Sequence, residues 1–394
     1  MRVAYVCADP GIPVFGRKGG SVHVQEVVRA LTKKGDLVEL FAARLGGPAP
    51  ADLANVAANE LPVGSAGDAG ARERACLDAN RRMASALSER GPFDVVYERQ
   101  SLFGFAGMEY ARDSGAIGLL EVNAPLVLEQ ETYRVLVDRA GAEESARRAF
   151  AAASAVLPVS RELVDLLESD PTLRGRVHEV PNGVDPDRFH PGLAPARAKK
   201  AGEFVVGFVG SLKPWHGLSV LAEAFELYSG RERGARLLVV GGGVGQETLE
   251  SEISSHGLAE KTVFTGAVSP DEVPGWLASM DAAAAPYRAL SDFYFSPLKL
   301  YEYMAAGLPV VASGIGQISE AIEDDRTGLL CPPGDASAFA AAFERLSRST
   351  DLRARLGEAA RKNVLRNHTW ASVAERIRKI ASGVGASPMM EALT

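Results

Sequence analysis

The chain has 394 residues, of which 46% are hydrophobic and 24% are charged, and its formal net charge is −7. Its length suits two or three domains that each bury a core, and its negative charge argues against nucleic-acid binding, which needs a basic face. Cys7, Cys76 and Cys331 lack the paired spacing of a metal site, so they indicate reduced thiols in the cytoplasm.

The first half of the chain alternates short apolar strands with helices. Met1–Ala8 breaks at Asp9, so it is too short for a signal peptide and predicts a buried strand. A glycine-rich loop over 16–21 follows, and then a helix with apolar residues at helical spacing that ends at Gly35. Further strands are predicted at 94–97, 117–122 and 155–158.

The second half repeats this plan after a segment rich in Pro, Asn and Gly, Val180–Pro191, which predicts a linker. Its strands are expected at 204–209, 236–240, 262–265, 282–285 and 309–312. Strands that alternate with helices in both halves predict parallel sheets in two Rossmann-like α/β domains, residues 1–185 and 186–370. In domains of this type that face each other across a cleft, ligands bind at the carboxyl ends of the strands.

The helix that follows Ser296 carries the clearest functional signal. Ser296 suits the N-cap, Pro297 suits the first helical position, and Gly307 can end the helix in left-handed geometry. Lys299 lies in the first turn, where the helix dipole disfavours a cation by roughly 0.3–1 kcal/mol. A bound anion would remove that conflict.

A diphosphate fits this helix start, because the N–H groups of Leu298 and Lys299 and the lysine ammonium would all face it. Glu302 lies three residues further on the same helical face and could accept both hydroxyls of a ribose attached to that diphosphate. The alternative is a Lys299–Glu302 surface pair worth about 0.2–0.5 kcal/mol.

The sequence EYMAAGLPVVA at 302–312 resembles the donor-binding motif of the retaining, nucleotide-sugar-dependent glycosyltransferases of family 4, also called glycosyl transferases group 1. The family pattern has two glutamates separated by seven residues. The second corresponds to Glu302, but the first is replaced by Tyr294. In the family the first carboxylate commonly holds hydroxyls of the donor sugar, so its replacement leaves the identity of the donor sugar undetermined. Asp292 could substitute, although a loop aspartate before a helix is more often a local turn acceptor.

The loop Gly210–Gly217 departs from the same family in its charges. The family commonly has an arginine after the first glycine and a lysine before the last, and here these positions are Ser211 and His216. We interpret Lys213 and Lys299 as the cations that meet the donor diphosphate. His216 is either a third donor or a capping or exposed histidine.

Backbone groups are expected to complete the donor site. The resemblance implies that the base is recognised largely through backbone near Gly266, Ala267 and Val268. In the first domain, Gly19 and Gly20 open a helix whose N–H groups can meet phosphate, or they form a plain tight turn.

Polar residues at predicted strand ends of the first domain are candidates for the acceptor or the donor sugar. Asn123 stands where the family often has histidine and could bind the donor hexose or the acceptor. Glu98, Arg99 and Glu121 either contact the acceptor or form a buried ion pair. His23, early in the first helix, either faces the acceptor or caps a turn.

The resemblance implies GT-B architecture, with a C-terminal helix at about 371–384 that packs back on the first domain. It also implies transfer of a hexosyl group from a UDP- or GDP-linked sugar to an acceptor hydroxyl with retention. No residue cluster has metal-ligand spacing, so neither a metal nor another cofactor is expected. The alternatives are a sugar-nucleotide epimerase or hydrolase of the same architecture and a non-catalytic sugar-nucleotide binding protein.

The expected partners are the donor and a hydroxyl-bearing acceptor. No run approaches the ~18 apolar residues of a membrane span, which leaves only weak peripheral membrane association open. The oligomeric state is left open between a monomer and a homodimer.

Overall fold

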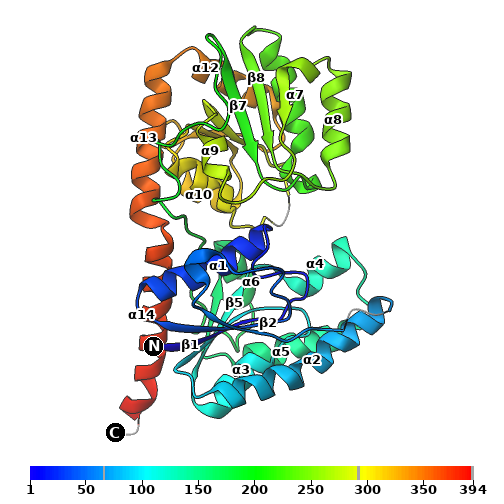
Figure 1. The fold of residues 1–394 in the computed structure, drawn as a ribbon, viewed down its shortest axis with the longest axis vertical. Coiled ribbons are helices and arrows are strands. Elements are labelled where there is room, and N and C mark those ends of the chain that lie inside the picture. The colour runs from blue at the N-terminus through cyan, green and yellow to red at the C-terminus, as the bar shows by residue number, and fades with distance from the viewer. Residues whose placement is uncertain (65–66, 291–292, 392–394) are drawn as a thin grey trace. The chain divides into compact units, whose positions relative to one another are not determined.

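The computed structural model describes residues 1–64, 67–290 and 293–391, with side chains described up to residue 385. The described chain forms two six-stranded sheets, and helices cover both faces of each (Figure 1). All neighbouring strands in both sheets run parallel. This confirms the predicted α/β fold with two Rossmann-like domains.

The chain is divided into two compact units. The first comprises Met1–Asn182, Tyr294–Ser296 and Trp370–Thr394, and the second comprises Gly183–Phe293 and Pro297–Thr369. The expected boundary, between residues 185 and 186, lies three residues beyond this division. A short segment in the middle of the second half thus belongs to the first unit.

The first unit has the strand order β3-β2-β1-β4-β5-β6. Its central strands are buried on both faces, as apolar parallel strands require. The strands are β1 (Arg2–Cys7), β2 (Leu37–Ala42), β3 (Ala57–Glu60), β4 (Val95–Arg99), β5 (Ile117–Val122) and β6 (Ala155–Pro158). The helices are α1 (Gly19–Lys33), α2 (Ala69–Arg90), α3 (Ala106–Ser114), α4 (Leu126–Tyr133), α5 (Arg139–Ala152), α6 (Arg161–Glu168) and α14 (Trp370–Glu391), with a short 3-10 turn, η1 (Ala51–Leu53).

The C-terminal helix α14 packs against α1 and β5 of this unit. None of the helices within the described residues is long and apolar enough to cross a membrane.

The second unit has the order β12-β11-β10-β7-β8-β9 around a core rich in phenylalanine. The strands are β7 (Phe204–Val209), β8 (Ala235–Val240), β9 (Thr262–Phe264), β10 (Ala282–Ala285), β11 (Val310–Ser313) and β12 (Leu329–Cys331). The helices are α7 (Leu218–Ser229), α8 (Gln246–Ser255), α9 (Val273–Leu277), α10 (Leu298–Ala305), α11 (Gly316–Ala321), α12 (Ala336–Ser347) and α13 (Thr350–Asn367), with 3-10 turns η2 (Pro214–His216) and η3 (Ala259–Lys261).

Each sheet reverses its strand order next to its first strand. The reversal lies between β1 and β4 in the first unit and between β7 and β10 in the second. Ligands of open parallel sheets bind outside the carboxyl ends of the strands at such points. The loops that leave these four strands are therefore where a site is expected.

The start of α10 differs from the prediction. The helix begins at Leu298 with Pro297 in the N-cap position, and within the described residues no side chain caps its first turn. Ser296 is therefore not the N-cap. Its hydroxyl instead accepts a hydrogen bond from the backbone N–H of Asn182 at 3.2 Å, which holds it away from the helix. Gly307 ends the helix with φ of 72°, which confirms the left-handed position.

Candidate functional site

Two glycines fix the loop that leaves β7 in the second unit. Gly210 has φ of +141°, and Gly217 has φ of +67°. A Cβ atom at Gly217 would lie 1.6 Å from the carbonyl oxygen of Pro286, which follows β10. The loop can therefore lie directly against the chain that leaves β10, at the point where the strand order reverses.

Lys299 reaches this loop from the first turn of α10. Its side chain is 9% exposed, and Nζ lies 4.2 Å from the ring centroid of Phe208 and 5.7 Å from that of Tyr287. A Cβ atom at Gly210 would lie 3.0 Å from Nζ. Among the residues that the structure describes, Nζ has no hydrogen-bond partner.

Burial lowers the pKa of Lys299 to about 7, and the nearby charge of Glu302 opposes that effect only in part. A buried ammonium without a hydrogen-bonding partner is costly, and an anion at this position would relieve the cost. The geometry of Lys299 therefore fits an anion site formed by the β7 loop and the start of α10.

His216 closes the same loop. Its Nδ1 lies 2.6 Å from the carbonyl oxygen of Ser211, and its ring packs edge-on against Tyr287 with centroids 5.7 Å apart. Burial and the charge of Lys299 lower the pKa of His216 to about 2. The neutral ring donates its Nδ1 proton to Ser211, which leaves Nε2 without a proton. In this arrangement His216 positions the loop and has no proton to donate to a phosphate.

The other predicted donor-site residues of the second unit surround this centre less closely. Lys213 is partly exposed, with Nζ 5.6 Å from the ring centroid of Trp215. Glu302 is partly exposed on α10. Gly266 accepts a hydrogen bond from Gly241 N at 3.0 Å, so the segment Gly266–Val268 lies beside the loop that leaves β8.

Two of the predicted donor-site residues before α10, Tyr294 and Ser296, belong to the first unit. Asp292 lies outside the described residues. Tyr294 is 8% exposed in the apolar cluster of the first unit, where its carbonyl oxygen accepts a hydrogen bond from Ser160 Oγ at 2.9 Å. Ser296 is held by Asn182, whose Nδ2 donates to the Ser296 carbonyl oxygen at 2.7 Å. Leu298, by contrast, is the first residue of α10.

Glu121, at the end of β5, is the centre of a polar cluster in the first unit. Tyr97 OH and His23 Nε2 lie 2.5 and 2.7 Å from Oε2, while Arg99 Nη1 and Asn123 Nδ2 lie 2.6 and 2.5 Å from Oε1. Burial alone would raise the pKa of Glu121, but His23, Arg99 and Tyr97 together hold it well below its usual range. The carboxylate is therefore charged and fixed in place.

His23 links this carboxylate to Asn182. Its Nδ1 lies 2.7 Å from Asn182 Oδ1, and its ring meets Trp370 edge-on at 5.4 Å between centroids. Because Asn182 Nδ2 donates to Ser296, the amide oxygen must face His23. Both ring nitrogens thus face oxygen atoms, those of Asn182 and Glu121. Of the two alternatives left open for His23, these contacts rule out a residue that only caps a turn.

Glu98 and Arg99 have different roles although they are adjacent. Arg99 and Glu121 form the buried ion pair that the sequence left as one alternative. Glu98 is 1% exposed and accepts a hydrogen bond from Met108 N in the first turn of α3 at 2.9 Å. Burial raises the pKa of Glu98 to about 7. Gly20 lies near Arg99, since a Cβ atom there would be 3.8 Å from Nη2, and Gly19 is exposed at the start of α1.

Sequence reasoning missed Asn182, Phe208 and Tyr287. Asn182 lies in a segment interpreted only as a linker, and the two aromatic residues resemble ordinary core positions. Within the described residues, no group of three or more His, Cys, Asp or Glu side chains could hold a metal ion.

Two family models match this chain, one in each half. Residues 17–188 match the family model of Glycosyltransferase Family 4, and residues 203–349 match that of Glycosyl transferases group 1. A D-inositol 3-phosphate glycosyltransferase of Acidothermus cellulolyticus is 29% identical over 95% of this chain and 89% of its own length. A GDP-mannose-dependent alpha-(1-6)-phosphatidylinositol monomannoside mannosyltransferase of Mycobacterium tuberculosis is 32% identical over 52% of this chain and 55% of its own length.

Solved structures share the fold at low identity. Sucrose-phosphate synthase from Thermosynechococcus elongatus superposes with a TM-score of 0.78 at 19% identity, over 98% of this chain and 100% of the other. HepE from Anabaena, solved with UDP, superposes with a TM-score of 0.73 at 19% identity, over 97% of this chain and 100% of the HepE chain. Each half of the chain is thus similar to a glycosyltransferase family model, and the solved structures show that the chain shares the fold of glycosyltransferases.

Proposed function

We propose that the protein transfers a hexosyl group from a nucleoside-diphosphate sugar to an acceptor hydroxyl with retention at the anomeric carbon. The observation that carries the proposal is Lys299, a buried ammonium without a hydrogen-bond partner among the described residues. It lies at the reversal of strand order, beside a glycine of the β7 loop. A diphosphate is an anion of suitable charge for that position.

The chemistry follows from where charge develops. As the bond between the anomeric carbon and the diphosphate breaks, negative charge grows on the departing phosphate oxygen. Lys299, Lys213 and the free N–H groups at the start of α10 would stabilise that charge more strongly than the charge of the bound donor, which is the condition for faster reaction. The acceptor hydroxyl attacks from the same face, and its proton passes to the departing phosphate oxygen. No metal enters this scheme, and we propose that none is required.

The nucleoside is proposed to be held by α10 and the β9 loop. Glu302 accepts the ribose hydroxyls, and the backbone of Gly266–Val268 meets the base. HepE was solved with UDP and with UDP-glucose, whereas the mycobacterial relative is GDP-mannose-dependent. These proteins support a nucleotide-sugar donor and leave both UDP and GDP as candidates. The relatives also differ in their named acceptors, so similarity does not fix the acceptor.

Thermal shift with UDP-, GDP- and dTDP-sugars tests donor binding, because a ligand at 100 times its Kd should stabilise the protein by about 2.7 kcal/mol. Lys299→Met should lose the shift, while Lys362→Met, an exposed lysine on α13 paired with Glu358, should retain it. Equal shifts in both variants would refute the assignment of Lys299.

Turnover separates the remaining functions. Incubation with donor alone should release nucleoside diphosphate slowly, and an acceptor library should accelerate the release. Rapid turnover of donor without acceptor would favour an epimerase or hydrolase. Binding without turnover, even with the library, would favour a non-catalytic sugar-nucleotide binding protein.

A further inference from the structure

A cavity of about 310 Å³ in the first unit lies at the carboxyl ends of β4 and β5. That volume is about twice the ~150 Å³ that encloses one benzene molecule in a protein core. Apolar side chains from the strand ends and from α4, α5 and α6 dominate its lining, including Leu102, Phe103, Val122, Leu126, Phe150 and Leu163. Pockets of this size and composition are typical of sites for small apolar groups.

The cavity adjoins the polar cluster around Glu121 through the strand ends. Gln100 and Val122 line the cavity, and their chain neighbours Arg99 and Glu121 form the buried ion pair. Successive residues of a strand point to opposite faces of a sheet, so the two features lie on either side of the same strand ends.

Phe103 forms part of the wall in a conformation that is unfavourable for a non-glycine residue. It has φ of 67° and is 2% exposed. Asn80 holds this loop, since Nδ2 donates to the Phe103 carbonyl oxygen at 2.8 Å and Oδ1 accepts from the N–H groups of Phe105 and Ala106 at 2.9 and 3.0 Å. Strained residues held by their surroundings cluster at ligand sites.

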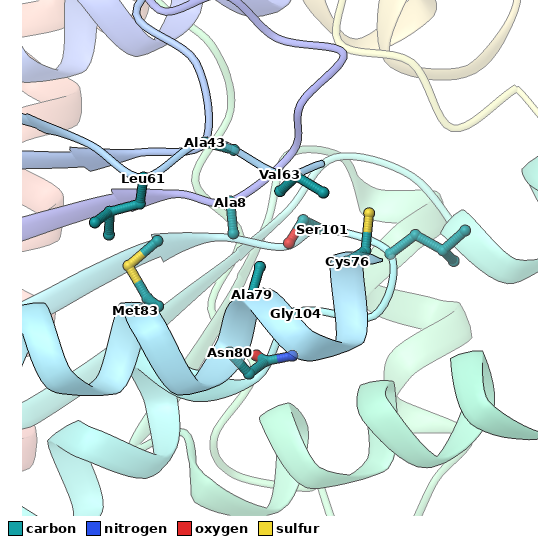
Figure 2. Close-up of a pocket in the computed structure, with 11 residues that line it drawn as sticks. Ala8, Ala43, Leu61, Val63, Cys76, Ala79, Asn80, Met83, Ser101 and Gly104 are labelled. Carbon is teal, nitrogen blue, oxygen red and sulfur yellow. The ribbon is translucent and has the colours of Figure 1, made fainter. Parts of the chain in front are cut away.

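A buried acceptor atom also lines the cavity. Gln100 Oε1 is buried and has no hydrogen-bond partner among the described residues. A ligand hydroxyl could donate to it. Ser101 Oγ is likewise buried without a hydrogen-bond partner among the described residues. Ser101 also lines a separate cavity of about 10 Å³ beside Ala8 and Ala79 (Figure 2). That space is close to the ~10–15 Å³ that one water molecule needs, so water suffices there.

The cavity opens at the surface. Leu128 on α4 and Leu166 on α6 belong to its lining and are 52% and 51% exposed. Arg139 and Glu131 also line it and form an ion pair at 3.2 Å. A ligand could therefore enter from the surface, and an apolar chain bound inside could extend toward this mouth.

We propose that this cavity binds the alkyl chain of the acceptor, so that the acceptor is an amphiphile with a hydroxyl-bearing head. This inference rests on the proposed function and names the class of its second substrate. The head would donate a hydroxyl to Gln100, and the chain would pack against Phe103 and Phe150. A cavity filled by side chains and a Phe103 without backbone strain would make the fold more stable. The strained backbone at Phe103 therefore supports a binding role for the cavity.

Isothermal titration with n-butyl, n-hexyl, n-octyl and n-decyl β-D-glucosides, below their micelle-forming concentrations, tests the cavity directly. Affinity should rise about fourfold for each added methylene, the factor that corresponds to ~0.8 kcal/mol per buried CH₂. The rise should stop at roughly eight to ten carbons, when the volume of about two benzene molecules is filled. Affinity that is independent of chain length would overturn the proposal.

Variants of α5 supply the matched comparison. Ala146 is half-buried and lines the cavity, whereas Ala151 on the same helix is exposed and outside the lining. Ala146→Phe should abolish the dependence on chain length, and Ala151→Phe should retain it. Leu166→Asp at the mouth is a second variant at an exposed position that tolerates substitution, and it should weaken decyl more than butyl binding. Retention of the full dependence in both cavity variants would contradict the assignment.

Gln100→Met tests the polar contact, because it removes the acceptor atom and keeps the side-chain length. It should weaken all four glucosides by the same factor. Donor binding by each variant, measured with UDP- and GDP-sugars, separates this inference from the proposed function. Chain-length dependence without donor binding would uphold the cavity and refute the glycosyltransferase site, and the reverse would refute the cavity alone.

Discussion

Lys299 should take up a proton when the donor binds. With a pKa of about 7, the neutral fraction of the Lys299 amine is roughly one half at pH 7, about 0.9 at pH 8 and about 0.1 at pH 6. A diphosphate beside Nζ favours the charged form and raises that pKa. Donor binding should therefore be accompanied by uptake of about 0.9 protons at pH 8 and about 0.1 at pH 6.

Titration calorimetry at pH 8 in Hepes and in Tris measures this uptake, because the two buffers release protons with different enthalpies. The ligand should be an intact nucleotide sugar, whose diphosphate has no proton to gain or lose near neutral pH. Lys299→Met should bind more weakly and show no proton uptake. Lys213→Met should also bind more weakly, but its uptake should match that of the unchanged protein. Equal heats in both buffers for the unchanged protein would refute the reasoning.

The same lysine predicts how stability without ligand depends on pH. Its pKa is lowered on folding, so between about pH 7 and its usual value of about 10.4 the unfolded chain binds more protons than the folded one. Stability contributed by this group therefore rises with pH across that window and is lowest below pH 7. The free energy of unfolding of Lys299→Met minus that of the unchanged protein should be largest at pH 6 and should fall above pH 7. Urea unfolding at pH 6, 7 and 9 measures it.

Four further outcomes are expected. Gly210→Ala should weaken donor binding at least tenfold by calorimetry, because its Cβ would lie 3.0 Å from Lys299 Nζ, whereas Gly202→Ala, also at positive φ but with open space around it, should not. Glu302→Gln should weaken the free nucleoside diphosphate and the sugar donor alike, by about 1.5–3 kcal/mol; a loss confined to the sugar donor would refute its ribose role. Glu121→Gln should lower the free energy of unfolding by about 3–5 kcal/mol at pH 7. That difference should shrink in acid, since a lowered carboxyl pKa gives stability that is present above its usual value and is lost as pH falls toward the folded-state pKa. Transfer should persist in EDTA, and silencing that Mn²⁺ reverses would contradict the lysine-based scheme.

The sequence predicts the fold well because its signals are local and repeated. Most strands are short apolar segments that alternate with helices, and each of the nine expected strands has its counterpart. The strands β2, β3 and β12 were not expected, and β3 lacks the apolar pattern because it is mostly exposed. The conflict between Lys299 and the dipole of α10 is also local, and it singled out a lysine whose Nζ is buried without a hydrogen-bond partner among the described residues. Its burial against Phe208 could not be read from the sequence, since β7 precedes α10 by about 90 residues.

The failures depend on partners distant in sequence. Ser296 fits the N-cap by type and position, yet its hydroxyl accepts from Asn182, 114 residues away. Tyr294 occupies the position of the missing family glutamate, but its side chain is buried in the first unit. His216 could be placed in the loop but not assigned a charge state, because that state depends on burial and on Lys299.

If Lys299 meets the donor diphosphate as proposed, its burial has a consequence for the order in which charge appears at the site. Without donor, about half of the Lys299 amines are neutral at pH 7, so the buried side chain carries a full charge only part of the time. Under the proposed function, the incoming diphosphate would restore the full charge and so complete its own binding site. In the proposed reaction, the ammonium would already be fixed beside the diphosphate oxygen that gains charge as its bond to the sugar breaks, so little reorganisation would be needed. A lysine on the surface would hold its proton at all times but would lose most of its electrostatic effect to water. Burial therefore suits a residue whose charge is needed only while the donor is bound.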